Sequence, residues 1–84
     1  MNNMNWVYVA YHEQNHCPIA SSDNWESLLS MIDEYYGSDG KRLGWYPYDP
    51  KFPDSYQGHF EYLDFLDNNS IDKINIYEVG FKGK

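Results

Sequence analysis

The chain has 84 residues, of which 42% are apolar and 19% aromatic, and its net charge is −7. This length predicts one domain, residues 1–84, whose small core depends on its rings, because each buried aromatic side chain covers a large apolar area. A surface this acidic repels nucleic acid and anionic lipid, which argues against direct binding to either, and it attracts basic proteins.

Cysteine use and hydropathy indicate the compartment. The single cysteine, Cys17, allows no internal disulfide, which fits a reducing environment. We expect no secretory signal, because the first residues contain no basic segment followed by an apolar run. No stretch approaches the roughly 20 apolar residues of a membrane span. We therefore expect a cytoplasmic protein without membrane contact.

Residues 5–11, NWVYVAY, predict a strand, because β-branched and aromatic residues dominate the segment. Bulky side chains alternate onto both faces, which favours a central position in a sheet. The polar run that follows, residues 12–18, predicts a connection. Residues 19–21 can then return as the second strand of a hairpin.

Residues 24–36 predict one amphipathic helix, because apolar side chains recur at helical spacing from Trp25 to Tyr36. Asp23 stands where an N-cap is expected, with Glu26 three positions later as in a capping box. Gly37 stands where a left-handed residue would end the helix.

Residues 37–57 predict a long loop rich in aromatic residues and proline. The prolines at positions 47, 50 and 53 exclude a regular helix, because proline removes a backbone donor. Long loops in compact domains tend to be functional. Two interpretations remain open: the rings form a binding surface, or they fold back over an exposed sheet face.

The end of the chain predicts a hairpin. Residues 73–81, KINIYEVGF, alternate as a strand does, whereas residues 58–66 fit either a strand or a helix. The intervening DNNS favours a turn, so we interpret residues 58–66 as a strand. Together these elements predict an α+β fold, in which a small antiparallel sheet of about three to four strands packs against the one helix, residues 24–36.

Residues 12–16 spell His-Glu-x-x-His, the string that zinc proteases carry on a helix with both histidines on one face. Here the string directly follows a strand, and Pro18 disfavours helix at the residue before it. We therefore predict no catalytic zinc and no cofactor. A non-catalytic metal site remains a minor alternative; its ligands would be His12, His16 and Cys17, with His59.

The sequence contains no assembled catalytic constellation. There is no glycine-rich phosphate loop, and acid pairs such as Asp33 with Glu34, or Glu61 with Asp64, are typical of a solvated face. We therefore expect a protein that is not an enzyme.

Two segments, residues 6–32 and residues 58–81, together resemble small proteins of phages and mobile elements. Those proteins open with a strand, a turn, a second strand and a capped helix, and they end with an aromatic, acidic hairpin. The resemblance implies an inhibitor of a host factor, of the anti-CRISPR or another counter-defence type. It also places the protein in the cytoplasm of a bacterial host.

Charge and resemblance together predict a stoichiometric inhibitor that occupies a basic, nucleic-acid-binding surface of a host protein. Carboxylates would stand in for phosphates; these are Asp33, Glu34, Asp49, Asp54, Glu61, Asp64 and Asp67. The expected partner-binding residues are Trp45, Tyr46, Tyr48, Asp49, Phe52, Asp54, Tyr56, Glu61 and Asp64.

Two alternatives remain open. The first is an immunity or antitoxin protein that neutralises a nuclease toxin. The second is a small-molecule binder that sequesters a nucleotide-like signal. The sequence leaves the oligomeric state open.

Overall fold

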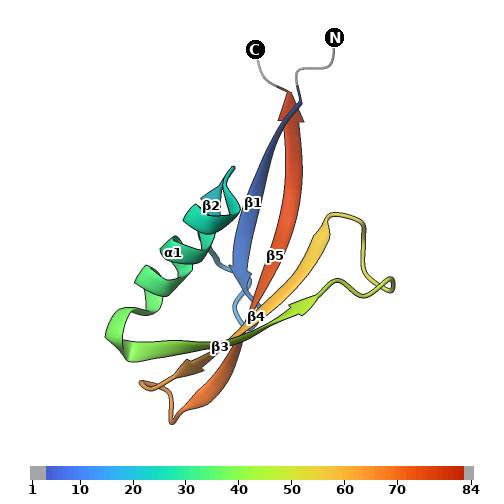
Figure 1. Ribbon diagram of the computed structural model, residues 1–84. Coiled ribbons are helices and arrows are strands. Elements are labelled where there is room, and N and C mark those ends of the chain that lie inside the picture. Colours follow the sequence, from blue (N-terminus) through green and yellow to red (C-terminus); the bar gives the residue numbers. More distant parts are fainter. Residues whose placement is uncertain (1–3, 83–84) are drawn as a thin grey trace.

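The computed structural model describes residues 4–82, which fold into one antiparallel sheet and one α-helix (Figure 1). The elements are β1 (Met4–His12), β2 (Pro18–Ser22), α1 (Trp25–Tyr36), the 3₁₀ turn η1 (Gly37–Asp39), β3 (Gly40–Pro47), β4 (Tyr56–Asp64) and β5 (Ser70–Lys82). The strand order is β2-β1-β5-β4-β3, so the predicted α+β class is confirmed. The sheet has five strands, one more than the largest number expected. No helix within residues 4–82 is long and apolar enough to cross a membrane.

The additional strand is β3, which lies in the segment that the sequence predicts to be a loop. Lys41 pairs with Leu63 of β4, and Tyr46 pairs with His59. Pro47 is the last residue of this edge strand, a position where its missing N–H removes little from the sheet. The prediction of a loop over residues 37–57 is therefore wrong. It relied on the glycines and prolines of the segment, which disfavour a strand in the local sequence pattern. The true connection is residues 48–55.

Helix α1 confirms the predicted helix but not its cap. The N-cap is Asn24, whose side chain accepts a hydrogen bond of 3.0 Å from the Ser27 N–H. The assignment of Asp23 as N-cap is thus wrong by one position. Gly37 ends the helix with a φ of +57°, as expected.

Both predicted hairpins are present. β2 returns antiparallel to β1, and β4 returns into β5. Asn68 and Asn69 both have a φ of +55° in the turn between β4 and β5, a conformation that asparagine tolerates. The interpretation of residues 58–66 as a strand is therefore confirmed as far as Asp64.

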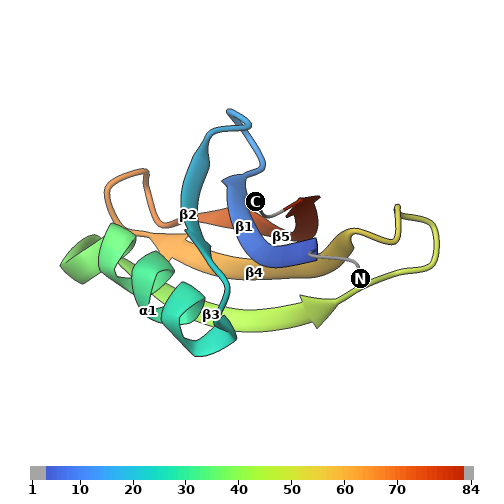
Figure 2. The ribbon, with the colours of Figure 1, turned by 90° about the horizontal axis from the view of Figure 1, so that it is seen from above.

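The core lies between α1 and one face of the sheet (Figure 2). Successive strand residues point to opposite faces, so only every second side chain can reach the helix. On β5, Ile74 and Ile76 are fully buried against α1, where they meet Leu28 and Ile32. Lys73, Asn75 and Tyr77 alternate with them and therefore point to the opposite side.

Candidate functional site

The sheet face opposite α1, here called the open face, is covered by no helix or strand within residues 4–82. β5 contributes Lys73, Asn75 and Tyr77, and β1 contributes Tyr11, which is the register partner of Asn75. His59 of β4 pairs with Asn75 from the other side. Three adjacent strands thus place polar and aromatic side chains next to one another.

A bulge in β4 brings Tyr56 to the open face. The register shifts between Tyr56 and Gly58, so that Tyr56 pairs with Tyr77. Gly58 has a φ of +134°, and a Cβ at this position would collide with the Tyr46 carbonyl oxygen and the Trp45 ring. Only glycine fits this bulge, which therefore positions the Tyr56 ring.

Four rings form a continuous row across the open face, here called the ring row: Phe52, Tyr56, Tyr77 and Tyr11. Their successive centroids lie 4.6, 5.2 and 5.8 Å apart, mostly in edge-to-face geometry. Beside the row, the Tyr46 ring stacks on His59 at 5.0 Å. Such pairs are favourable aromatic contacts, so the rings hold one another in place.

Hydrogen bonds fix the polar groups under the ring row. The Tyr56 hydroxyl donates to Asn75 Oδ1 at 3.0 Å and lies 3.4 Å from His59 Nδ1. Burial raises the pKa of Tyr56, so the hydroxyl keeps its proton. Burial lowers the pKa of His59 below its usual 6.5, and Lys73 acts in the same direction. His59 is therefore neutral at pH 7.

The open face is hollowed along the ring row. One hollow of about 300 Å³ lies between the 48–55 connection and β5, with Phe52, Asn75 and Tyr77 among its lining residues. A second of about 360 Å³ shares Asn75 and Tyr77 and extends toward Tyr11 and His16. The two hollows thus adjoin at Asn75 and Tyr77.

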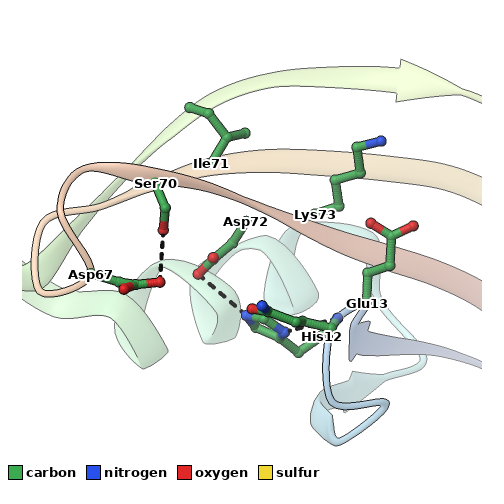
Figure 3. A pocket seen from close by; sticks show the side chains of 8 residues that line it. His12, Glu13, Asp67, Ser70, Ile71, Asp72 and Lys73 are labelled. Atoms are coloured by element: carbon green, nitrogen blue, oxygen red, sulfur yellow. Dashed lines mark hydrogen bonds and ion pairs between the residues drawn. The ribbon is translucent and has the colours of Figure 1, made fainter.

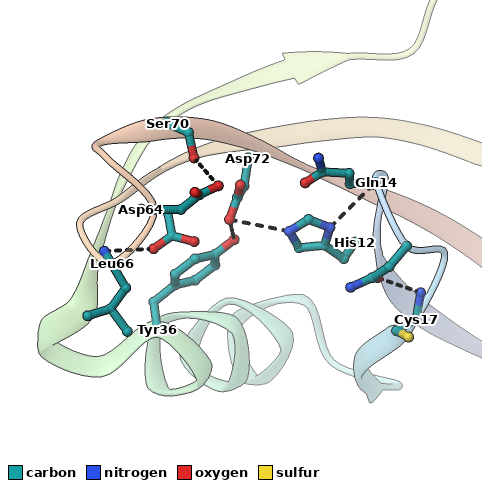
Figure 4. Close-up of polar contacts among 10 residues, drawn as sticks. His12, Gln14, Cys17, Tyr36, Asp64, Leu66, Ser70 and Asp72 are labelled. Carbon is teal, nitrogen blue, oxygen red and sulfur yellow. Dashed lines mark hydrogen bonds and ion pairs between the residues drawn. The ribbon is translucent and has the colours of Figure 1, made fainter.

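A buried polar network lies on the other side of the sheet, under α1 (Figure 4). Asp72, only 6% exposed, accepts a hydrogen bond of 2.8 Å from the Tyr36 hydroxyl and lies 3.3 Å from His12 Nε2. His12 Nδ1 accepts from the Gln14 N–H at 3.3 Å, so Nε2 carries the ring proton. The network ties β1, α1 and β5 together.

His12 also lines a pocket of about 350 Å³ with Asp72 and Ser70, a set of residue types used in nucleophilic catalysis (Figure 3). Both ring nitrogens of His12 are already engaged within the fold, and the Ser70 hydroxyl donates to Asp67 at 3.0 Å. No ring nitrogen faces the hydroxyl as a base would. The hydrogen bonds of His12, Asp72 and Ser70 connect parts of the fold, and they do not align a base with a nucleophile.

The His-Glu-x-x-His string lies at the end of β1 and in the following turn, not on a helix. His12 points toward Asp72, and His16 has a left-handed φ of +57°. Cys17 is exposed, and its N–H donates to Asn15 Oδ1. Within residues 4–82, no three His, Cys, Asp or Glu side chains gather where they could hold a metal ion.

The residues expected to bind a partner lie in different parts of the molecule. Tyr46, Phe52, Tyr56 and Glu61 belong to the open face or its edge. Trp45 points to the helix side, where its ring lies 4.6 Å from Phe60.

The remaining expected residues lie in the 48–55 connection or at the end of β4. The Tyr48 hydroxyl donates to the Phe52 carbonyl at 2.7 Å, and Asp49 accepts from the Lys51 N–H at 3.0 Å. Asp54 is exposed in the same connection. Asp64 lies at the opposite end of β4 and accepts from the Leu66 N–H. The expected set thus spans both faces and both ends of β4.

The acids expected to mimic phosphates separate in the same way. Asp33, Glu34, Asp64 and Asp67 lie near the end of α1 and the β4–β5 turn, whereas Asp49 and Asp54 lie in the 48–55 connection at the far end of β3 (Figure 1). Asp33 is also engaged within the fold, since it accepts from the Tyr62 hydroxyl and lies 3.5 Å from Arg42.

Sequence reasoning missed the central residues of the open face: Glu13, Tyr11, His59, Lys73, Asn75 and Tyr77. Alternation along residues 73–81 already separates Tyr77 from Ile74 and Ile76. The missing information was which of these two faces the helix covers.

Comparisons of the chain with models of protein families, with curated proteins and with solved structures give no match. The functional proposal therefore rests on the open face, on the charges around it and, for the class of partner, on the sequence resemblance described above.

Proposed function

We propose that this protein is a small acidic binding protein that docks on a basic partner protein through the open face. It acts by occupancy and not by catalysis, as a stoichiometric inhibitor of a surface with which the partner binds nucleic acid. The observation that carries the proposal is the ring row from Phe52 to Tyr11 on a sheet face that no helix or strand within residues 4–82 covers.

The state of the rings supports a binding role. Phe52 and Tyr46 are 49% and 47% exposed, although both lie against a neighbouring ring. Tyrosine side chains are common anchors at interfaces because they bury much area for little conformational entropy. A row that is already ordered avoids part of the entropy that binding would otherwise cost.

Charge supports a basic partner. The net charge of −7 steers cationic proteins toward the molecule and repels nucleic acid. The carboxylates of Asp49 and Asp54 lie next to the open face in an exposed connection. Because the acids lie at two ends of the molecule, we propose that those near the open face contact the partner while the others contribute steering.

The partner class follows from the resemblance to phage and mobile-element proteins. Such a gene would supply an inhibitor of a defence protein in the cytoplasm of a bacterial host. An immunity protein against a nuclease toxin would use the same surface and charges. The identity of the captured partner separates these two cases.

The proposal is tested by capture of partners from nuclease-treated bacterial lysate at low and high salt. The tagged wild-type chain is compared with the double variant Tyr46→Ser and Phe52→Ser, which removes two exposed rings of the open face. Tyr35→Ser is the matched control, because Tyr35 is 55% exposed on α1.

We expect one basic protein to bind the wild type and the control, to release as salt rises, and to be lost from the double variant. Added duplex DNA should compete for that protein. Capture that the double variant retains would contradict docking through the open face, and capture that is indifferent to salt and DNA would contradict the basic partner surface.

A further inference from the structure

The hollow next to Phe52 has the dimensions of a site for one side chain. Its volume is about 300 Å³, at the lower end of the range for ligand pockets. Its walls come from five parts of the chain: the turn after β1, the end of β3, the 48–55 connection, β4 and β5. Such a composite site is open to a partner but still bounded by ordered strands.

The walls combine aromatic rings with carboxylates. Phe52, Tyr56 and Tyr77 supply the rings, and Glu13 and Asp49 supply the acids. The Phe52 ring packs against Tyr56 at 4.6 Å yet remains 49% exposed, so part of it faces the hollow. Aromatic faces attract cations, and carboxylates accept their hydrogen bonds.

The two acids have no cationic partner within the described part of the chain. Neither Glu13 nor Asp49 forms an ion pair there, and the only side-chain hydrogen bond of Asp49 is the one from the Lys51 N–H. The turn that carries Glu13 is held in place, because its N–H donates to the Lys73 carbonyl oxygen at 2.9 Å.

Lys73 is the one cation that lines the hollow. It is the cross-strand neighbour of Glu61 on β4, so its charge has an acid beside it. Figure 3 shows Lys73 and Glu13 projecting away from the buried Asp72 and His12, toward the open face. With His59 neutral, two acids against one cation leave the hollow with a net negative charge.

We infer that this hollow receives one arginine side chain of the basic partner, with the guanidinium against the rings of Phe52 and Tyr77 and its N–H groups on the carboxylates of Glu13 and Asp49. This inference rests on the proposed function and names the group that the site recognises. Arginine fits better than lysine, because its planar guanidinium stacks on rings and presents several donors in one plane.

The test uses N-acetyl-arginine amide as the probe and the NMR spectrum of the isotope-labelled chain as the readout. N-acetyl-lysine amide tests the shape of the cation. N-acetyl-citrulline amide has nearly the shape of the arginine probe but no charge. We expect saturable shifts of the Glu13, Asn75 and Tyr77 amides with arginine, weaker shifts with lysine, and none with citrulline at the same concentrations.

Two variants test the carboxylates. Glu13→Gln and Asp49→Asn should each weaken arginine binding by about two- to fivefold, the range for an exposed ion pair. Glu26→Gln, at an exposed acid of α1 outside the expected binding set, should leave the affinity unchanged and is the matched control. Equal binding of arginine and citrulline, or unchanged affinity in both test variants, would overturn the inference.

Failure of this inference differs from failure of the proposed function. If the arginine probe does not bind while the open-face rings are still needed to capture a basic partner, the arginine site is wrong and the docking surface stands. If the probe binds as expected but the double variant still captures the partner, the arginine site stands and docking through the open face is wrong.

Discussion

The two faces of the sheet use the same residue types in opposite ways. Under α1, the tyrosine hydroxyls are buried and donate to acids, as Tyr36 does to Asp72 and Tyr62 does to Asp33. On the open face, Tyr11, Tyr56 and Tyr77 contact one another edge to face; Tyr56 is buried, whereas Tyr11 and Tyr77 are half-buried. Ring contacts occur on both faces, since Tyr36 stacks on Tyr62 at 4.4 Å, and the Tyr56 hydroxyl of the open face donates to the Asn75 amide and not to an acid. Part of the aromatic content thus lies outside the core, on the open face.

The largest expected difference between the faces is in stability. Ile32→Ala removes a fully buried side chain from the core and should lower the free energy of unfolding by about 2–5 kcal/mol. Ile71→Ala makes the same change at a strand position that is 50% exposed, and should cost about 0.5 kcal/mol or less. Urea unfolding of both variants measures the difference. Similar losses at the two sites would show that the open face is packed as tightly as the core.

The next effect concerns the network under α1. Asp72→Asn replaces an acceptor that serves both Tyr36 and His12 and turns an amide N–H₂ toward a donor, which should cost about 1–3 kcal/mol. Asp67→Asn, in the exposed β4–β5 turn, is the matched control and should cost much less. Thermal unfolding compares the two. An unchanged midpoint in Asp72→Asn would mean that the network does not hold the layers together.

Alkaline pH should weaken the face under α1. Burial and the hydrogen bond to Asp72 raise the pKa of Tyr36, and burial and the bond to Asp33 raise that of Tyr62. The unfolded chain then loses these protons first, so stability falls as pH rises through about 10, the ordinary tyrosine value. Unfolding should therefore become progressively easier as pH rises above about 10, and Tyr36→Phe should make this slope shallower. If Tyr36→Phe and Tyr62→Phe both leave the slope unchanged, the two buried hydroxyls are not the cause of the alkaline loss of stability.

The smallest expected effect is the response of the open face to acid. Burial lowers the pKa of His59, so the unfolded chain binds this proton first as pH falls. The stability that neutral His59 contributes is present above about pH 6.5 and is lost as pH falls below it. His59→Gln should remove this part of the acid dependence. Identical wild-type and variant curves between about pH 7 and pH 5 would contradict it.

Elements with a local signal could be predicted from the sequence. The apolar side chains from Trp25 to Tyr36 predict α1, because their helical spacing is a local pattern that can be recognised within the segment itself. The exact cap could not be predicted, since Asp23 and Asn24 both suit the position. β3 was missed because Gly40, Gly44 and Pro47 disfavour strand locally. Its pairing with β4 is a long-range interaction that no local pattern reports.

The candidate site depends on the same long-range pairing. Tyr56, His59 and Asn75 meet because β4 and β5 are adjacent and because a bulge at Gly58 turns Tyr56 to the open face. Neither the adjacency of the two strands nor the bulge can be predicted from the spacing of residues along the chain. The prediction of rings and acids as a binding surface therefore found Phe52 and Tyr56 but also included Trp45, which the register turns toward the core.

NMR of the labelled chain with its captured partner would show whether the open face is the docking surface. Signals of Tyr46, Phe52, His59 and Tyr77 should change on complex formation, while those of Tyr35 on α1 should not. Changes centred on the exposed side of α1, with the open-face signals unaltered, would show that the partner docks elsewhere.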